Sequence, residues 1–360
     1  MSRDAPITNG GDAGAPGGSC PLPISTYERI VLAHGSGGKL SQSLIREVVL
    51  PEFRNDLLAP LHDGAIFPIG GARVAFSTDS YVVNPLFFPG GDIGRLAIHG
   101  TVNDLAMCGA QPLYLSASFI LEEGLPMEQF QRVVRSMRTA SAEAGVQLVT
   151  GDTKVVDRGK ADGIFVNTSG VGLVPDGVNI HPARAAAGDK ILLSGAIAMH
   201  GIAIMSMREG LEFETEIASD SAPLNGLVEA LLAGNRDIHV LRDPTRGGVT
   251  SALVEIAQSA GAGMLLDEAV IPVHEEVRGA CEILGLDPLH VANEGKLIAI
   301  VPPSDAERAL GAMRAHPLGR EAAIIGEVTA GNSGYVLMKT RVGGTRVVDM
   351  LSGEQLPRIC

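Results

Sequence analysis

The sequence predicts an α+β protein built from two α/β-layered domains and a flexible C-terminal tail. Short apolar runs typical of strands alternate with helical patterns along the chain. Apolar residues make up 45% of the 360 residues, which is enough to fill two cores. The 45 glycines and the absence of tryptophan indicate many tight turns and cores of small aliphatic side chains. We expect an N-terminal domain over residues 27–178 and a C-terminal domain over residues 179–342.

The first predicted domain alternates strands and helices. The run RVAFSTDSYVV, which begins at Arg73, has the composition of a strand. Asp92 is suited to cap a helix that continues to Met107. Pro126 then opens a second helix, which ends at Gly145, and the strand QLVTGDTKVV follows. This order predicts a layered domain whose polar loops gather at one edge.

The second predicted domain begins after a turn-rich segment at residues 174–190, which makes the best boundary. A strand restarts the pattern at ILLSGAI. We expect helices over 221–233, 247–260 and 274–285, and strands at LIAIV and near YVLMKT.

Both ends of the chain lack such patterns. Residues 1–26 surround GGDAGAPGG and carry too few apolar side chains for a core, so we expect a disordered leader. Residues 343–360 are predicted to form a mobile tail that closes in LSGEQLPRIC.

Charge and cysteine content limit the partners and the compartment. The formal net charge of −13 argues against nucleic acid, whose phosphates need clustered Lys and Arg. The four cysteines lie far apart, which favours free thiols in a reducing compartment over zinc or disulfides. No apolar run reaches the length of a signal peptide or a membrane span. We therefore expect a cytoplasmic protein with no nucleic acid and no membrane partner.

Four acidic residues beside Gly, Ser, Thr or Asn stand at strand ends or within turns and helices: Asp63, Asp79, Asp104 and Asp152. Converging carboxylates suit Mg²⁺ that bridges polyphosphate oxygens, because this ion takes hard oxygen ligands. Each acid taken singly is better explained as a helix cap or a solvated turn. The magnesium site is predicted from their joint placement.

Two glycine-containing segments could approach a phosphate. HGSGGK, from His34 to Lys39, lacks the Walker A spacing and taken alone favours an ordinary turn. DPTRGGV, from Asp243 to Val249, sets an arginine and two glycines ahead of a helix, which is a natural phosphate clamp. A proline-initiated turn with Arg246 in a surface ion pair explains it equally well.

Three further residues are candidates for chemistry. Lys154 and Glu294 could transfer protons if their surroundings shift their pKa values, although an ion pair or a solvated position also explains each of them. Cys360 ends the chain on a predicted tail, where it serves no core. At ~3.3–3.6 Å per residue the tail could carry this thiol into a cleft and out again.

FSTDSYVVNPLFFPGG, LAIHGTVNDLAMCGAQP, TGDTKVVDRG, TRGGV, ANEGKL and the terminal PRIC together resemble the HypE family of hydrogenase maturation proteins, from about Tyr27 to Cys360. That family belongs to the PurM-like superfamily, with aminoimidazole ribonucleotide synthetase, selenophosphate synthetase and thiamine monophosphate kinase. The internal motifs are typical of the superfamily, and the terminal cysteine is typical of HypE.

The resemblance implies a homodimer of PurM-like subunits with ATP in clefts near the dimer interface. It also implies a carbamoyl dehydratase. HypF, a carbamoyltransferase, would place a carbamoyl group on Cys360, and ATP-dependent dehydration would give a thiocyanate. Its cyanide would pass to iron on the HypC–HypD complex for [NiFe]-hydrogenase.

The resemblance also assigns site residues. The implied catalytic groups are Cys360, Lys154 and Glu294, and the implied metal ligands are Asp63, Asp79, Asp104 and Asp152. The implied ATP-binding residues are Gly35, Gly37, Gly38, Asp79, Asn103, Asp104, Thr153, Asp243, Arg246, Gly247 and Gly248.

Two positions depart from the family pattern, Pro244 and Met199, and the second leaves the role of His200 open. The enzymatic alternative is another ATP-using member of the superfamily such as selenophosphate synthetase, whose reactive cysteine would lie at the glycine loop, but HGSGGK carries none. A non-catalytic assembly scaffold is the other alternative. The intact acids, Lys154 and Glu294 argue against it.

Overall fold

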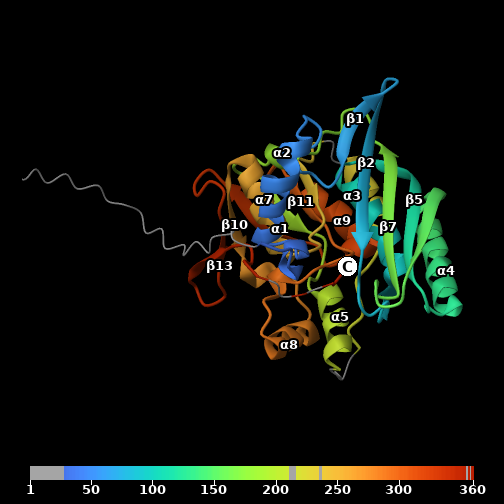
Figure 1. Cartoon of the computed structure of the whole chain (residues 1–360). Coiled ribbons are helices and arrows are strands. Elements are labelled where there is room, and N and C mark those ends of the chain that lie inside the picture. The colour runs from blue at the N-terminus through green and yellow to red at the C-terminus, as the bar shows by residue number, and fades with distance from the viewer. Residues whose placement is uncertain (1–27, 211–215, 235–236, 354–355, 357) are drawn as a thin grey trace, which may run out of the picture. The chain divides into compact units, whose positions relative to one another are not determined.

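The computed structural model describes residues 28–210, 216–234, 237–353, 356 and 358–360. Residues from Val31 to Cys360 form one compact unit (Figure 1). The predicted leader, residues 1–26, lies outside the described residues. No helix in the described ranges is long and apolar enough to cross a membrane.

The first sheet has five strands in the order β1-β2-β7-β5-β6. Only the β5 and β6 pair is parallel, and the other neighbours run antiparallel. Helices α3 and α4 cover one face, and the other face is open (Figure 1). The bounds are β1 Ala65–Ile69, β2 Ala72–Tyr81, β5 Gln111–Glu122, β6 Gln147–Val156, β7 Ile164–Leu173, α3 Ile93–Met107 and α4 Met127–Ala144, with a short pair β3 Phe87–Phe88 and β4 Gly91–Asp92.

The two predicted helices of this layer form as expected. The Asp92 Oδ1 atom accepts hydrogen bonds from the main-chain nitrogens of Gly94 and Arg95, which caps α3. Helix α4 ends where Gly145 takes a left-handed φ of 71°. The helices pack so closely that a Cβ on Gly94 would lie 2.6 Å from the Val133 carbonyl oxygen.

The second sheet has seven strands in the order β14-β13-β10-β12-β8-β11-β9 and is covered on both faces. The side chains of neighbouring residues on one strand therefore point to opposite faces of the sheet and pack in different hydrophobic clusters. Ile298 and Ile300 pack in the cluster that contains α7, whereas Ala299 and Val301 pack in the cluster that contains α6 and α9. Burial of both faces explains the continuous apolar runs ILL and IAIV.

The C-terminal half of the chain contains helices α5 to α9 and strands β8 to β14. The predicted helices at 221–233, 247–260 and 274–285 are confirmed as α6, α7 and α8 to within a few residues. The bounds are α5 Met199–Glu209, α6 Asn225–Gly234, α7 Gly248–Ala260, α8 Glu275–Leu284, α9 Ala306–Ala315, β8 Lys190–Leu193, β9 Val240–Arg242, β10 Gly263–Asp267, β11 Ile298–Val301, β12 Ala323–Thr329, β13 Val336–Lys339 and β14 Thr345–Val348.

A helical segment precedes the first sheet and was not predicted. It consists of α1 Lys39–Leu44, a π-helical turn Ile45–Val49 and α2 Leu50–Phe53. Short 3-10 turns lie at Leu32–Gly35, Pro182–Arg184, Glu268–Val270, Pro288–His290 and Pro317–Gly319.

One hydrophobic core runs through both sheets. It contains α3 and residues of β8, β9 and β11, so the predicted domains share packing across residue 178. The Asn103 side chain adds polar links: its Oδ1 accepts from the Leu224 main-chain nitrogen at 2.8 Å, and its Nδ2 donates to the Ala222 carbonyl at 3.1 Å. These contacts fix α3 against the second half of the chain.

The predicted tail needs a correction. Strand β14 lies within residues 343–360 and pairs antiparallel with β13, so a patternless tail beginning at residue 343 is wrong. Further along, the Leu351 carbonyl accepts from the Lys39 main-chain nitrogen at 3.0 Å. Only 9% of Cys360 is exposed. The described end of the chain is therefore docked in this structure.

His99 offers a test of how α3 is buried. It is fully buried, and burial together with Arg95 lowers its pKa to about 3. The unfolded chain, with an ordinary histidine pKa, binds the proton first as the pH falls. Stability is therefore lost between about pH 6.5 and pH 3. We expect His99→Gln to flatten the fall of the free energy of unfolding over this range, measured by urea denaturation at several pH values. Equal slopes in the two proteins would contradict this burial.

Candidate active site

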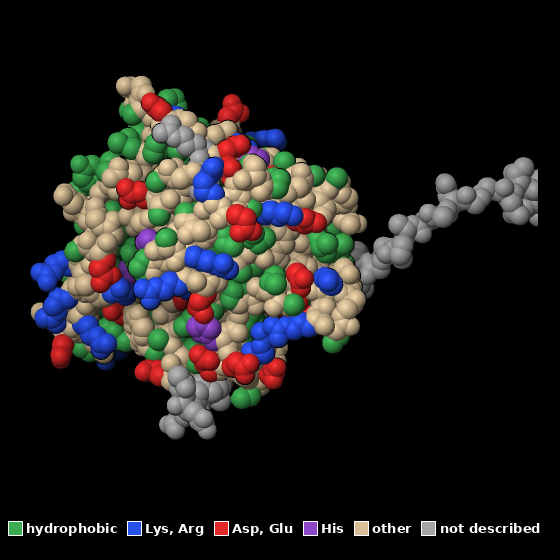
Figure 2. Space-filling model, turned by 180° about the vertical axis from the view of Figure 1, so that it is seen from behind, with side chains coloured by type: hydrophobic (Ala, Val, Ile, Leu, Met, Phe, Trp, Pro, Cys, Tyr) green, Lys and Arg blue, Asp and Glu red, His purple; other side chains and the backbone are tan. Residues whose placement is uncertain are grey.

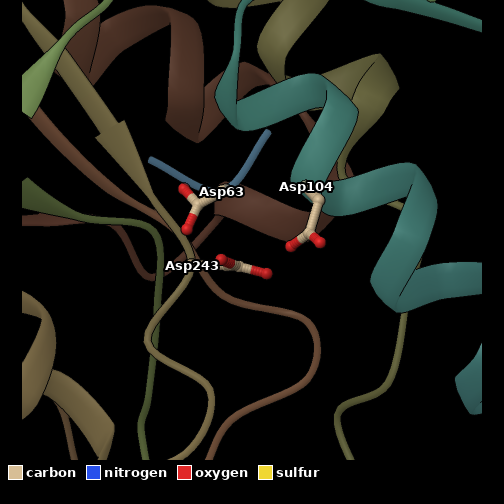
Figure 3. A group of neighbouring side chains, drawn as sticks. All are labelled: Asp63, Asp104 and Asp243. Atoms are coloured by element: carbon tan, nitrogen blue, oxygen red, sulfur yellow. The ribbon is translucent and has the colours of Figure 1, made fainter. Parts of the chain in front are cut away.

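Three carboxylates from distant segments meet in the interior (Figure 3). Asp63 precedes β1, Asp104 lies on α3 and Asp243 follows β9. Their ligand oxygens all lie within 4.8 Å of one another. Three negative charges at this separation repel strongly unless protons or cations offset them.

The protein offsets only part of this charge. Arg242 Nη1 lies 2.9 Å from Asp63 Oδ1, and the Ser77 hydroxyl donates to Asp104 Oδ2 at 2.6 Å. Although burial raises the pKa of Asp63, Arg242 and His62 hold it below the ordinary value.

The other two carboxyl groups shift in the opposite direction. Burial, reinforced by Asp243, Asp79 and Asp63, raises the pKa of Asp104 well above its ordinary value. Burial and Asp63 raise the pKa of Asp243 to about 8. Without a cation, the Asp243 carboxyl group therefore holds a proton near neutral pH.

The cluster fits a hard divalent cation. Asp63 Oδ2 and Asp243 Oδ2 are buried and have no hydrogen-bond partner among the described residues. Carboxylate oxygens are the ligands that Mg²⁺ and similar ions prefer. Binding would satisfy both orphaned atoms and relieve the repulsion that raises the pKa values.

The two remaining predicted metal ligands lie differently. Asp79, on β2, acts electrostatically on Asp104 and Asp243, so it borders the cluster. Asp152, on β6, is largely exposed and accepts two hydrogen bonds from the Lys154 ammonium, at 2.6 and 2.8 Å. Within one chain, Asp152 is therefore not a member of the cluster, whereas Asp243 is.

A cleft of about 740 Å³ opens beside the cluster. This volume is typical of small-molecule and cofactor sites. Cationic side chains are concentrated in it although the chain is acidic overall, which suits a polyanionic ligand. The lining includes the predicted Gly35, Gly37, Gly38, Asp243, Arg246 and Gly248, together with His34, Arg46, Arg54, His62 and Arg242.

The glycine segments lie against each other at this cleft. Gly37 has a φ of 77°, and a Cβ there would lie 2.7 Å from the Arg246 Cβ and carbonyl oxygen. Gly247 and Gly248 also have positive φ, and α7 begins at Gly248. A side chain at Gly37 or Gly247 would push the two segments apart, and one at Gly248 would meet the Leu289 carbonyl oxygen at 2.4 Å. The two predicted phosphate-binding segments thus line one wall.

The docked C-terminus lies next to this wall. A small pocket between them is lined by Gly38, Arg246, Leu356 and Ile359. Burial raises the pKa of the Cys360 thiol, Arg246 partly opposes the shift, and Glu294 adds to it. The docked thiol is therefore protonated at neutral pH, which makes it a weak nucleophile.

Glu294 is buried at the junction of the two halves. Its main-chain nitrogen donates to Asp220 Oδ1 at 3.1 Å, and its side-chain Oε1 has no partner among the described residues. Burial, followed by Asp243 and Asp79, raises the pKa of this carboxyl well above its ordinary value. Glu294 can therefore hold a proton near the cluster and the thiol.

Three predicted residues take positions that sequence reasoning did not anticipate. The Asn103 amide is fully engaged by protein main chain, so it positions α3 and Glu294. Thr153 and Lys154 lie on the exposed edge strand β6, with Lys154 paired to Asp152. Arg242, which sequence reasoning missed, directly precedes DPTRGGV at the end of a short apolar strand.

The comparisons with known proteins agree with this architecture. The family described as AIR synthase related protein, N-terminal domain, matches residues 61–174, and its C-terminal domain counterpart matches residues 186–339. A carbamoyl dehydratase HypE of Cupriavidus necator is 58% identical over 341 residues, which cover 94% of this chain and 97% of the relative. The chain belongs to the HypE family.

Solved HypE structures share the fold. A crystal structure of HypE in complex with ATP is 51% identical, with a TM-score of 0.78, and covers 92% of this chain and 100% of that chain. The structure of a HypE–HypF complex matches at 49% identity and a TM-score of 0.82, over 86% of this chain and 100% of that chain. A thiamine monophosphate kinase of Aquifex aeolicus, at 16% identity and a TM-score of 0.62, shares the fold.

HypE membership assigns the chain to hydrogenase maturation and confirms the predicted PurM-like fold class. The first matched domain contains all five strands of the first sheet, and the second contains β8 to β13. The boundary at residue 178 remains a prediction.

The acidic cluster predicts a pH-dependent response to divalent cations. Raised carboxyl pKa values mean that the cation-free fold loses stability as the pH rises from about 4 to about 8. A bound cation removes this loss. We expect Mg²⁺ to raise the midpoint of thermal unfolding more at about pH 8 than at about pH 6, and Asp104→Asn to reduce the effect. Asp176→Asn, at an exposed position, is the matched control. A cation effect that Asp104→Asn leaves intact would contradict the assignment.

Proposed function

We propose that this chain is an ATP-dependent carbamoyl dehydratase that converts an S-carbamoyl group on Cys360 into a thiocyanate. The cyanide would become a ligand of iron in [NiFe]-hydrogenase. The supporting observation is the position of Arg246, which lines the cleft and, together with Ile359, also lines the small pocket beside the docked terminus. The names of the HypE relatives and the ATP complex of one of them support the same activity.

The chemistry balances as a phosphoryl-assisted dehydration. The carbamoyl oxygen takes the γ-phosphoryl group of ATP with loss of a nitrogen proton, and ADP leaves. The C–O bond then breaks, phosphate leaves with that oxygen, and the second nitrogen proton is lost, which gives Cys–S–C≡N. Activation is needed because an amide oxygen is a poor leaving group until it carries phosphate.

The residues divide this work by position. The cluster of Asp63, Asp104 and Asp243 would hold Mg²⁺, which neutralises phosphate charge when bound. The segments around Gly37 and Gly248 line the cleft without side chains at these two positions, so a phosphate could come close to the main chain there. Glu294, whose Oε1 has no hydrogen-bond partner among the described residues and whose pKa is raised, is assigned the transfer of a nitrogen proton.

Lys154 can serve this reaction only from a second subunit. In the sheet register Lys154 pairs with Ile120 on β5, and β7 lies between β5 and β2. A carboxylate oxygen of Cys360 accepts from Val82, just beyond β2. Lys154 on β6 and the main chain just beyond β2 are therefore three strand spacings apart, which is roughly 14 Å. This distance exceeds the reach of a lysine side chain.

A homodimer across the open face of the first sheet would supply that lysine. Phe76 and Tyr114 are 41% and 46% exposed there, and Ile120, the neighbour of Lys154, is 44% exposed. Apolar side chains on an uncovered sheet face favour a partner surface.

We propose two further partners. HypF would deliver the carbamoyl group, and the HypC–HypD complex would receive the cyanide.

Subunit mixing tests the shared site. Lys154→Ala and Cys360→Ala should each be inactive alone, because each removes one essential group. If Lys154 acts on the partner's tail, a mixed dimer contains one complete site, and mixing the variants after subunit exchange should restore ATP-dependent dehydration. Lys160→Ala, an exposed lysine near the same strand, should retain activity alone. Absence of complementation in verified mixed dimers would exclude action in trans.

Mass spectrometry of the C-terminal peptide tests the carrier role directly. After incubation with HypF, carbamoyl phosphate and ATP, the peptide should first gain one carbamoyl group and then lose one water. Cys360→Ala should show neither species, whereas Cys20→Ala should behave as the wild type. Either adduct in Cys360→Ala would refute the proposal.

A further inference from the structure

The last three residues of the chain are held mainly through their main chain. A carboxylate oxygen of Cys360 accepts from the Val82 nitrogen at 3.1 Å, and the Arg358 carbonyl accepts from the Asn84 nitrogen at 3.3 Å. The Ile359 carbonyl lies 2.8 Å from His200 Nε2. Each of the three residues therefore has a main-chain oxygen with a protein donor.

Helix α5 supplies the side-chain donors. His200 is fully buried, and because a carbonyl can only accept, its Nε2 carries the proton. Its Nδ1 then accepts from the Ser219 hydroxyl at 2.8 Å, which fixes this tautomer. Arg208, two turns further along α5, donates to the carbonyls of Asn84 and Arg358.

We propose that His200, Arg208, Asp162 and the segment 82–84 form a peptide-binding cradle. Its ligand is an extended C-terminus with arginine two residues before the end, and its usual occupant is this chain's own terminus. The inference deepens the proposed function, because it explains how Cys360 is presented to the cleft. It also assigns a role to His200, as a positioning residue.

Side-chain recognition in the cradle centres on Arg358. Its Nε donates to the Val82 carbonyl at 3.0 Å, and its Nη2 pairs with Asp162. Arg358 has a φ of 52°, a left-handed conformation that costs a non-glycine residue energy unless contacts compensate. Ile359 is 3% exposed and packs in the main core. The docked state is therefore held by contacts that must all form together.

None of these cradle contacts uses the sulfur atom. They involve main-chain oxygens, the guanidinium of Arg358 and apolar packing of Ile359. A group on Sγ would leave every one of these hydrogen-bonding atoms available, although it would need room in the core in which Cys360 and Ile359 pack. The polar contacts of the cradle are therefore the same before and after Cys360 is modified, and they depend on the peptide rather than on the thiol.

Alkylation of the full-length protein tests the ion pair without ATP or a carbamoyl group. The rate of Cys360 alkylation by iodoacetamide is followed by mass spectrometry of the C-terminal peptide. Arg358→Asp and Asp162→Arg should each raise this rate about tenfold, because a like-charge pair replaces an ion pair. The double variant should return toward the wild-type rate. Arg135→Asp and Asp176→Arg, both exposed and outside the cradle, are matched controls.

The alkylation experiment has three informative outcomes. Single variants that match the wild type, or a double variant that is no slower than the singles, would overturn the cradle. Rescue in the double variant supports it, because general damage to the fold would not be reversed by a second charge reversal. Thermal unfolding verifies that each variant is folded.

Hydrogen exchange tests independence from sulfur. The amides of Val82 and Asn84 should stay protected in full-length Cys360→Ser and should exchange faster in Arg358→Asp and in His200→Phe. Loss of protection in Cys360→Ser would show that the thiol drives docking. Since neither measurement involves dehydration, failure of the cradle and failure of the proposed enzyme activity are distinguishable.

Discussion

The Asn103 side-chain amide is the contact on which the geometry of the site most depends. It lies on α3, inside a core shared by both sheets, and it bonds main-chain groups at Ala222, Leu224 and Glu294. Asp104 is the next residue on the helix. One buried polar side chain therefore sets the acidic cluster and the Glu294 carboxyl in a fixed relation, and a buried amide that is fully satisfied tolerates little displacement.

The site contains repulsion between carboxylates that a bound ligand can relieve. Three carboxylates converge while Arg242 neutralises mainly Asp63, so Asp104 and Asp243 keep raised pKa values. Cationic side chains line the neighbouring cleft. The two features meet at Asp243, which belongs to the cluster and also lines the cleft, and at Arg242, which pairs with Asp63 and Glu255. A polyphosphate with its cation would match both, which is why the two features together are more informative than either one.

The docked terminus connects this electrostatic site to the proposed carrier chemistry. Inside, the Cys360 thiol is protonated and shielded, so it is poorly suited to accept a new group there. To leave, the tail must give up a few main-chain hydrogen bonds, one partly exposed ion pair and the burial of Ile359. The left-handed conformation of Arg358 lowers that cost. One tail could then accept the carbamoyl group while it is released from the protein and undergo dehydration while it is docked.

The sequence by itself determined the local features: the cap at Asp92, the end of α4 at Gly145, three helices of the second half, and the two glycine segments, because these depend on neighbours along the chain. It also indicated the family through its motifs. Only the tertiary structure decided that Asp243 joins Asp63 and Asp104 while Asp152 pairs with Lys154, and that Asn103 is structural. Only the tertiary structure showed that the predicted tail contains strand β14 and that the end of the chain is docked. These outcomes depend on which strands become neighbours and which core is shared, and contacts between residues distant in sequence leave no local pattern.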